Sequence, residues 1–581
     1  MIDSLSTTTS DTGNVGHARL GDARGEGDRA RPLRLESALA LAAYSAISFL
    51  YFGFRVVGDF TGSYVGGNGP DPKLFVWAMA WWPHSIGMVN PLFSPAIWAP
   101  EGYNLTWATT VPLLSMGASP VTLAFGPVAS YNVLMLAAPA LAGWTAYLLC
   151  RHVARSHAAA LLGGYLFGFS SYQLSHMRGG HLNLLFVFLI PVAVLLVLEV
   201  IEGGIRRRRF LVLMTVTLAC QFLISLEVFA TASVLGIGCL LLAWLLTPPG
   251  RREPIRRGLV ALLLSYVFAG LLVAPILAVM FGRTEPFQGL DVVYGSADIL
   301  NFVLPTELTW LGGSASATIT HRFTGSVSGQ SAYFGFILLI ILVWFVIERR
   351  GSVSGRVLGI SFAAISMLSL GPVLKIAGQE SISLPWELAD GIPLIEKALP
   401  GRFILYAFLA VAVALALWLT GTQERPMSQR LLRWGLALLA IVLMVPTGHD
   451  WMWRTTLRRP DFFSTGAYIR YIRPGDNILI IGPGTAAEPM VWQADSDFRF
   501  ELAAAYTGGV PPDLASDPLR PYLQQQHCVP VAVFSELREF LLDHDVDLVV
   551  AYKREKLCPT LDLEVRPVDV LDVRIYRLKP Q

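Results

Sequence analysis

Charged residues are scarce in this sequence. They make up 15% of its 581 residues, whereas soluble domains carry about 25%, so an entirely soluble protein is excluded. The net charge of +2 gives no sign of a nucleic-acid partner, and none is expected. The five cysteines do not have the spacing of a metal site. The first 35 residues contain no apolar signal-peptide core, so the first membrane span is expected to direct the chain to the membrane.

Long apolar runs dominate the chain instead. Eleven of them are long enough to cross a hydrocarbon core of roughly 30 Å as helices. The runs near 210–226 and 229–247 are separated only by Ser225–Val228, which predicts a tight turn. We therefore expect a polytopic α-helical membrane protein with about eleven transmembrane helices. The remaining runs lie near 36–56, 128–150, 158–175, 182–202, 258–281, 331–348, 355–373, 402–420 and 431–447.

The placement of arginine predicts the orientation of these spans. Basic residues collect in alternate short loops, on the same side as the arginine-rich N-terminus, and cytoplasmic loops carry such an excess. The N-terminus is therefore expected in the cytoplasm and the C-terminus outside it. High alanine and arginine content favours a bacterial plasma membrane. The residues concerned are Arg151, Arg155, Arg206 to Arg209, Arg251, Arg252, Arg256, Arg257, Arg349, Arg350, Arg356, Arg425, Arg430 and Arg433.

Three parts are expected along the chain. Residues 1–35 are polar and lack apolar periodicity, which indicates a disordered cytoplasmic N-terminus. Residues 36–447 hold the spans and two long outer loops, at 58–127 and 282–330, and loops of this length usually carry function. The first of them has the pattern of two short helices on the membrane surface. Its aromatic side chains, which suit the headgroup region, are Phe75, Trp77, Trp81, Trp82, Trp98 and Trp107.

Residues 448–581 have a soluble composition. The apolar runs that begin at Asn477 and Val546, and the alternation that begins at Val573, predict strands, while 533–544 has helical spacing. We expect a small extracytoplasmic α/β domain. Cys528 and Cys558 would both lie in it, where a disulfide can form, and two free thiols are an equal alternative.

Asp71 is the first candidate for chemistry. It lies in the stretch GNGPDPKLFVWAMAWWPHS, just after the first span. An aspartate before Pro72 is a preferred way to begin a helix, so a capping role is one interpretation. The other is that its carboxylate, at the outer membrane face, takes a proton from a nucleophilic hydroxyl. Asp59, at the end of the first span, is the second candidate for this base, and a polar helix stop is the alternative.

The expected outer face carries few cations. Arg178, Arg402 and Arg322 are the candidates for binding a phosphate, because the arginine fork makes bidentate charge-assisted hydrogen bonds. Arginines that extend from helix ends to the headgroups are the alternative for each. His181 joins Arg178 as a candidate for substrate binding. With His176 it could also bind a metal, but their spacing favours an ordinary polar loop, so no metal ligand is assigned.

Further substrate-binding candidates lie around these residues. Glu227 falls at the tight turn before the sixth span, where an ionisable group is functional by default, although exposure to headgroups would also explain it. Asp298, in the second long loop, either lines an acceptor cleft or caps the next helix. The indole rings of Trp77, Trp81 and Trp82 either anchor the first loop in the interface or stack on sugar.

The first loop resembles that of the GT-C glycosyltransferase superfamily, whose members transfer a sugar from a polyprenyl-phosphate carrier to an acceptor outside the cytoplasm. In the protein mannosyltransferase and lipid A aminoarabinose transferase branches, this loop carries Asp-Glu with a tyrosine four residues after the aspartate. Asp71 matches the aspartate, whereas Pro72 replaces the glutamate and Phe75 the tyrosine. The second carboxylate is therefore missing, and dependence on a divalent cation stays open.

The membrane part also resembles a group of bacterial membrane proteins described as YfhO-like or GT-C-like. The resemblance covers most of the spans and implies a GT-C-like arrangement. The stretches that carry it are Asp71-Pro72, Asn90-Pro-Leu-Phe, Ala99-Pro-Glu-Gly-Tyr-Asn-Leu-Thr-Trp107, Gly126-Pro-Val-Ala-Ser-Tyr-Asn132, Phe167-Gly-Phe-Ser-Ser-Tyr172, Gly180-His-Leu-Asn183 and Leu399-Pro-Gly-Arg-Phe403.

Together these resemblances imply an inverting membrane glycosyltransferase. Its donor would be a polyprenyl-phosphate sugar, and its acceptor a cell-envelope glycan, lipid or protein. Two alternatives stay open. One is a transporter or flippase of a lipid-linked sugar, which needs no base, although the paired broken helices of many transporters are not evident. The other is a non-catalytic envelope scaffold, which the missing second carboxylate favours.

Overall fold

The computed structural model describes residues 22–282, 292–313, 316–388, 398–421, 425–482, 487–508, 518–525, 530–553, 561, 563 and 565–579. Cys528 and Cys558 lie outside the described residues, and the expected disulfide stays a prediction. The helix α1 (Asp22–Tyr51) begins inside the stretch that we expected to be disordered.

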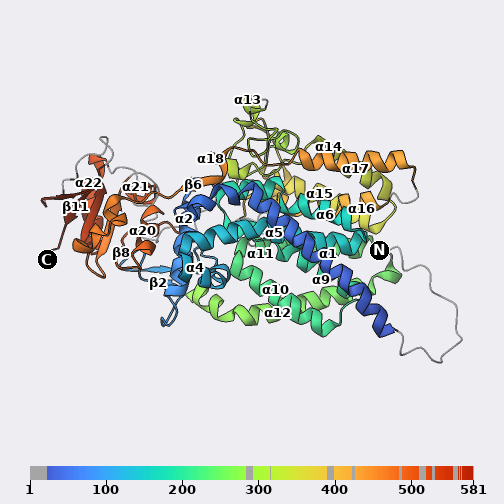
Figure 1. The fold of residues 1–581 in the computed structure, drawn as a ribbon, viewed down its shortest axis with the longest axis horizontal. Helices are drawn as coiled ribbons and strands as arrows, with labels where there is room; N and C mark the ends of the chain where they lie inside the picture. Colours follow the sequence, from blue (N-terminus) through green and yellow to red (C-terminus); the bar gives the residue numbers. More distant parts are fainter. Residues whose placement is uncertain are drawn as a thin grey trace.

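A bundle of long helices fills the centre of the molecule (Figure 1). Each of the eleven predicted apolar runs coincides with helical structure. Among the described residues, six helical segments are long and apolar enough to cross a membrane: 34–55, 127–154, 182–202, 226–246, 253–282 and 400–420. The chain is thus a helical membrane protein, and the count of eleven spans and their orientation stay predictions. After α1 the bundle contains α5 (Pro127–Ala154), α6 (His157–Gly168), α7 (Ser171–Gly179), α8 (Leu182–Leu185), α9 (Leu189–Glu202), α10 (Arg207–Ile224), α11 (Leu226–Leu246), α12 (Glu253–Gly282), α14 (Phe336–Arg349), α15 (Val353–Ser369), α16 (Ile404–Thr420) and α17 (Met427–Val442).

The helix α5 lies at the heart of this bundle and contacts α1, α6 and α16. Small residues permit its close approach to α6. A Cβ atom at Gly168 would lie only 2.6 Å from the carbonyl oxygen of Pro139. Membrane helices associate through such small residues because no difference in hydrophobicity from the lipid drives their packing.

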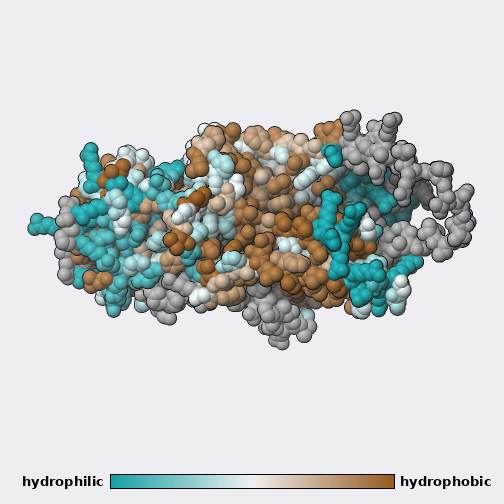
Figure 2. All heavy atoms as spheres, turned by 90° about the horizontal axis from the view of Figure 1, so that it is seen from below, coloured by the Kyte–Doolittle hydropathy of each residue, from teal (hydrophilic) through white to brown (hydrophobic). Residues whose placement is uncertain are grey.

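The surface of the bundle is apolar. Figure 2 shows a hydrophobic region across the middle of the molecule, with hydrophilic side chains at both ends. Exposed apolar side chains of the bundle helices include Leu263, Val267, Leu271, Phe281 and Val343. Soluble monomers rarely expose so continuous an apolar surface, so this region is the part expected to lie in lipid.

The first long loop folds against one end of the bundle. It contains β1 (Ser63–Val65), α2 (Pro70–His84), β2 (Phe93–Ser94), β3 (Tyr103–Asn104), α3 (Pro112–Gly117) and α4 (Ser119–Phe125). The expectation that its aromatic rings settle at the headgroups is wrong for most of them. Phe75, Trp77, Trp81, Trp82 and Trp98 are at most 7% exposed. They are buried because the C-terminal part of the chain packs over α2.

Residues 448–579 form the C-terminal unit, which lies beyond this end of the bundle (Figure 1). Its five-stranded sheet has the order β10-β11-β9-β7-β8, with β7 parallel to β8 and β9. The predicted strands and helix are present, so its α/β character is seen in the structure, while its exact boundary stays a prediction. The elements are α18 (Asp450–Trp453), β6 (Arg454–Thr456), α19 (Asp461–Ser464), β7 (Asn477–Ile481), α20 (Glu488–Asp495), β8 (Glu501–Leu502), α21 (Arg520–Gln525), α22 (Phe534–Asp543), β9 (Leu548–Tyr552), β10 (Val568–Val570) and β11 (Val573–Arg577).

Two strand contacts and one helix pair dock this unit on the first loop. The strand β6 pairs antiparallel with β1, and Ile97 forms an isolated parallel bridge with Leu502 of β8. The helix α20 packs on α2, where Trp77 Nε1 donates to Gln493 Oε1 at 2.9 Å. The contact is therefore built from backbone ladders as well as side chains.

A second connection, between α12 and α14, and a third, between α15 and α16, lie together at the same end, where Asp298 forms a bridge with Lys375. The second connection contains the short elements η5 (Ile299–Phe302) and α13 (Ala317–Thr320), and the third contains β4 (Val373–Ile376), β5 (Gln379–Ser383), η7 (Pro385–Leu388) and η8 (Pro400–Phe403). The segment η8 leads directly into α16, which places Arg402 at the end of the bundle that carries the first loop.

A buried ion pair crosses the docking contact. Lys73 Nζ of α2 lies 2.6 Å from Glu488 Oε1 of α20, and the two side chains are 4% and 8% exposed. Lys73 Nζ also donates to Asn68 Oδ1 at 2.8 Å. Breaking a buried pair leaves one charge without compensation, which typically costs 3–5 kcal/mol.

Replacing Lys73 by methionine is therefore expected to destabilise the docked state by about 3 kcal/mol, measured as a lower melting temperature in detergent micelles. The double variant Lys73→Met with Glu488→Gln should recover part of this loss, because no buried carboxylate then stays unpaired. Equal melting temperatures for wild type and the single variant would contradict a buried pair.

Candidate functional site

Asp71 is the second residue of α2 and does not cap it. The helix begins at Pro70, with Gly69 at the N-cap position and no capping side chain. The capping interpretation is therefore wrong. Each carboxylate oxygen instead meets a side-chain partner from a distant part of the chain. The Tyr506 hydroxyl donates to Oδ1 at 2.7 Å, and His181 Nε2 lies 3.1 Å from Oδ2.

The charge on Asp71 is stabilised by these partners. Burial raises the pKa of its carboxyl, but the hydrogen bonds from His181 and Tyr506 and the charge of Arg402 outweigh this. The pKa therefore lies below its ordinary value, and the group is ionised near neutral pH. Its side chain remains 32% exposed, so a substrate can reach it. Each oxygen still has one lone pair free for a new donor.

Tyr506 stays protonated beside this carboxylate. Burial and then the charge of Asp71 raise the pKa of its hydroxyl well above the ordinary value. It therefore acts as a hydrogen-bond donor throughout the physiological pH range.

His176 sets the tautomer of His181. Their Nδ1 atoms lie 2.9 Å apart, so one must donate and the other accept. Burial, followed by the charge of Arg402, lowers the pKa of His176 well below its ordinary value, so its ring is neutral. Its Nε2 is buried without a hydrogen-bond partner among the described residues. An unprotonated Nε2 is the less costly choice there, so we assign the proton to Nδ1, which donates to His181. The Nε2–H of His181 is then directed at Asp71.

Replacing His176 by phenylalanine removes this donor while keeping a ring against Tyr172, whose centroid lies 4.4 Å away. We expect His181 to lose its fixed orientation and the pKa of Asp71 to rise, because the hydrogen bond from His181 is weakened. Carbodiimide couples only to protonated carboxyls, so Asp71 should be labelled up to about tenfold faster between pH 5 and 7. Mass spectrometry of the Asp71 peptide measures this rate.

His152→Phe is the matched control, because His152 contacts Glu199 and Glu202 instead. Equal labelling of Asp71 in wild type and His176→Phe would show that the histidine pair does not hold this carboxylate.

Arg402 and Glu227 form the second part of the site. Nη1 of Arg402, in η8, donates to Oε2 of Glu227, in the first turn of α11. The other oxygen of Glu227 is buried without a partner among the described residues. The positive charge of Arg402 also acts on Asp71 and Tyr506. Arg402 therefore interacts with two carboxylates: it bonds Glu227 at the end of the bundle, and its charge acts on Asp71 of the first loop.

Arg178 lies on the other side of the turn that carries His181. Its guanidinium passes over Gly67, where a Cβ atom would lie 1.1 Å from Nη1, and sits 5.8 Å from the centre of the Trp451 ring. Burial lowers the pKa of its guanidinium, and the nearby charge of Glu307 opposes this. Within the described residues, Arg178 forms no salt bridge, and its Nε is buried without a hydrogen-bond partner. Its two Nη groups are therefore the candidates for binding an anion.

Other predicted residues lie elsewhere or are used structurally. Asp59 accepts from the Ser63 hydroxyl at 2.7 Å and faces Arg454 at 4.0 Å. Arg322 is exposed on the second connection. Asp298 is a cap, since its oxygens accept from the backbone N–H groups of Leu300 and Gly378 at 2.9 and 2.7 Å. An acceptor-lining role for Asp298 is therefore not supported.

The tryptophans of α2 are committed to packing. Trp77 stacks on Trp81 with ring centres 5.4 Å apart, and Phe498 packs edge-on against both. Their indole N–H groups donate to Gln493 and to the carbonyl of Pro91, and that of Trp82 donates to the carbonyl of Thr110. Buried rings with satisfied donors cannot stack on sugar or anchor in headgroups, so both predicted roles are replaced by docking of the C-terminal unit.

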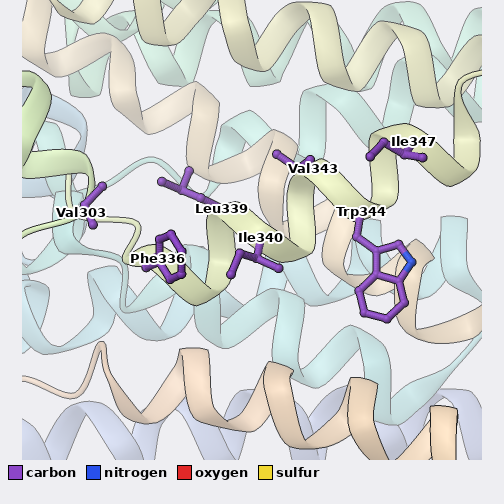
Figure 3. Close-up of a pocket in the computed structure, with 7 residues that line it drawn as sticks. All are labelled: Val303, Phe336, Leu339, Ile340, Val343, Trp344 and Ile347. Carbon is purple, nitrogen blue, oxygen red and sulfur yellow. The ribbon is translucent and has the colours of Figure 1, made fainter.

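An apolar groove runs along α14, away from the Asp71 group. It has a volume of about 480 Å³ and is lined by Val303, Phe336, Leu339, Ile340, Val343, Trp344 and Ile347, all drawn in Figure 3. These seven side chains offer no acid, base or nucleophile. The groove is part of the surface expected to face lipid.

In the part of the chain that the structure describes, no group of three or more His, Cys, Asp or Glu side chains is arranged to hold a metal ion. His176 and His181 bond to each other, as argued above, rather than presenting two free nitrogens to an ion.

The fold and the site thus define a helical membrane protein with a carboxylate site where its bundle meets a C-terminal α/β unit. The chain belongs to the family described as "Domain of unknown function (DUF6311)", which matches residues 40–447. The YfhO-like placement stays a prediction. No curated protein matches the sequence.

Several solved structures are similar over most of the chain. One is the archaeal oligosaccharyltransferase AglB from Archaeoglobus fulgidus, in complex with an inhibitory peptide and a dolichol-phosphate, with 12% identity and a TM-score of 0.49 over 89% of this chain and 69% of that chain. Another is the arabinofuranosyltransferase AftD from Mycobacteria, with 13% identity and a TM-score of 0.49 over 93% of this chain. This chain spans 40% of the AftD chain.

Proposed function

We propose that this protein is an inverting membrane glycosyltransferase of the GT-C type. Its donor is a polyprenyl-phosphate sugar, and its acceptor is a hydroxyl of a cell-envelope glycan, lipid or protein. The Asp71 end of the bundle faces the outside of the cytoplasm, as the arginine distribution predicts. The reaction takes place there, between the bundle and the C-terminal unit.

One observation carries this proposal. Asp71 is an ionised carboxylate, reachable by substrate, that distant side chains hold at the end of an apolar bundle. A helix cap would bond to backbone N–H groups, and a structural ion pair would bond to a buried cation. Asp71 does neither. A carboxylate held in this way is positioned to accept a proton from a hydroxyl, although its lowered pKa makes it a weaker base than a free aspartate.

The residues of the site support a single displacement. The acceptor oxygen attacks the anomeric carbon of the donor sugar and forms the new glycosidic bond. The bond from that carbon to the carrier phosphate oxygen breaks, and the phosphate leaves with the electron pair. Asp71 takes the proton of the acceptor hydroxyl. Attack opposite to the leaving group inverts the configuration.

Two arginines are our candidates for stabilising the departing phosphate. Arg178 is the stronger candidate, because its guanidinium forms no salt bridge within the described residues. Arg402 already gives one N–H to Glu227, so part of its charge is compensated. Preorganised cations at the point where charge develops contribute substantially to catalysis. Whether a divalent cation assists is left open, and every step above uses the residues of the chain.

A reconstituted system tests the proposal. Purified protein in lipid vesicles would receive a panel of radiolabelled polyprenyl-phosphate sugars together with envelope lipid and glycan fractions as acceptors. Label that leaves the carrier and appears on an acceptor would support a transferase. Label that crosses the bilayer while still on its carrier would support a transporter instead. Absence of both, with donor binding intact, would contradict the proposed function.

A further inference from the structure

We propose that Tyr506 is a positioning residue through which docking of the C-terminal unit makes Asp71 ready to act as a base. The inference rests on the proposed function for the role of Asp71. The inference goes beyond the proposed function, because it makes the C-terminal unit a part of the active site rather than a separate module that binds the acceptor.

Geometry is the first support for this inference. Tyr506 lies 435 residues from Asp71 in sequence, and its hydroxyl donates to Oδ1 at 2.7 Å. No other part of the C-terminal unit has a hydrogen bond to Asp71 among the described residues. Tyr506 therefore carries the direct contact between this unit and the carboxylate.

The position of Tyr506 depends on docking. The preceding strand β8 is held by the first loop, since Leu502 N donates to Ala96 O at 2.9 Å and Ala99 N donates to Leu502 O at 3.0 Å. On the other side of Tyr506, Trp98 Nε1 donates to Thr507 Oγ1 at 3.3 Å. The segment with Tyr506 is thus fixed to the first loop at both ends. If the unit undocks, the hydroxyl leaves Asp71.

The other groups that face Asp71 come from the bundle. They are His181 from the turn after α7, Arg402 from η8 and Tyr131 from α5, whose hydroxyl donates to Gly180 O at 3.2 Å. These groups stay in place whether or not the C-terminal unit is docked. Undocking therefore removes one of the two direct hydrogen bonds to the carboxylate and frees it to rotate about its side-chain torsion.

This arrangement has a functional consequence. A base fixed by two donors presents its remaining lone pairs in one direction, and correct orientation of a catalytic group is a large part of its effect. An acceptor that binds to the C-terminal unit and stabilises docking would thereby also hold the Asp71 carboxylate in the orientation that a base needs. Sugar transfer would then be linked to the presence of acceptor.

Tyr506→Phe tests this, with Tyr468→Phe as the matched control, because Tyr468 lies in the same C-terminal unit and packs against Phe463 instead of contacting Asp71. Two quantities are measured on the full-length protein in detergent: the rate of carbodiimide labelling of Asp71 between pH 5 and 7, and the single-turnover rate of sugar transfer. Melting temperatures establish that both variants are folded.

We expect Tyr506→Phe to label Asp71 about tenfold faster and to transfer sugar about tenfold more slowly with unchanged donor affinity, while Tyr468→Phe resembles wild type. Labelling of Asp71 at the wild-type rate in Tyr506→Phe would overturn the inference. Faster labelling in a protein whose wild type transfers no sugar would support the contact of Tyr506 with Asp71 and contradict the proposed function. The two failures are therefore distinguishable.

Discussion

Replacing Asp71 by asparagine is expected to lower the rate of sugar transfer by about 10²–10⁴-fold, the usual contribution of a general base. Donor affinity should be unchanged, because the phosphate is held by arginines. The variant should also fold. An asparagine amide has the same shape, its oxygen can accept from His181, and the Tyr506 hydroxyl can turn to accept from its NH₂ group. Initial rates in lipid vesicles measure the effect.

Asp59→Asn is the matched control for this prediction. Asp59 is the second carboxylate of the first loop that the sequence suggests as a base, and it contacts Ser63 and Arg454 instead of the Asp71 group. Its variant should retain the wild-type rate. Loss of activity in Asp59→Asn together with full activity in Asp71→Asn would show that Asp59 is the base.

Replacing Arg178 by glutamine is expected to weaken donor binding by about 10- to 100-fold. A hydrogen bond to a charged group contributes about 1.5–3 kcal/mol, which corresponds to this range. The loss should appear in the Kd for the polyprenyl-phosphate sugar, measured by binding of labelled donor to purified protein. Arg178→Lys should recover only part of it, because lysine lacks the bidentate fork.

Gly67→Ala tests the same arginine without removing its charge. The new methyl group would lie 1.1 Å from Nη1 of Arg178, so the guanidinium must move. We expect a weaker affinity for donor in the same direction as for Arg178→Gln. Gly58→Ala is the control, since no atom lies within 4 Å of its added Cβ. If Gly67→Ala and Arg178→Gln both bind donor with wild-type affinity, Arg178 does not bind the carrier phosphate.

Much of the bundle could be predicted from the sequence because each helix is encoded by a local apolar run. All eleven runs coincide with helices, even the pair joined at Ser225, which α10 and α11 share as a single connecting residue. The strands of the C-terminal unit were also visible as short apolar or alternating segments. These features depend on neighbouring residues, which a sequence pattern records.

The parts that could not be predicted depend on contacts between distant segments. Trp77 and Trp81 have the composition of interfacial residues, and only the packing of α20 on α2 buries them. Asp71 has the sequence context of a helix cap, yet α2 begins one residue before it. Tyr506 carried no signal at all, because a single tyrosine in a soluble segment does not indicate that it reaches a carboxylate 435 residues away.

Within the site, the sequence indicated the residues of the bundle better than their partners. Asp71, His181, Arg402 and Glu227 were all selected, and the structure brings them into one group. The sequence did not indicate that Arg402 is bonded to Glu227, which makes the unpaired Arg178 the better phosphate ligand. Nor did it indicate that His176 directs His181 at Asp71. A pattern of residue types indicates candidate residues, whereas the hydrogen bonds and ion pairs between them become known only from the three-dimensional structure.

A single-turnover experiment tests the central claim most directly. Wild type and Asp71→Asn would each be loaded with a labelled polyprenyl-phosphate sugar, mixed with acceptor, and followed for release of label from the carrier. The account predicts equal loading of both proteins and rapid release from wild type alone. Release at the same rate from both proteins would contradict a role for Asp71 as the base of a sugar transfer.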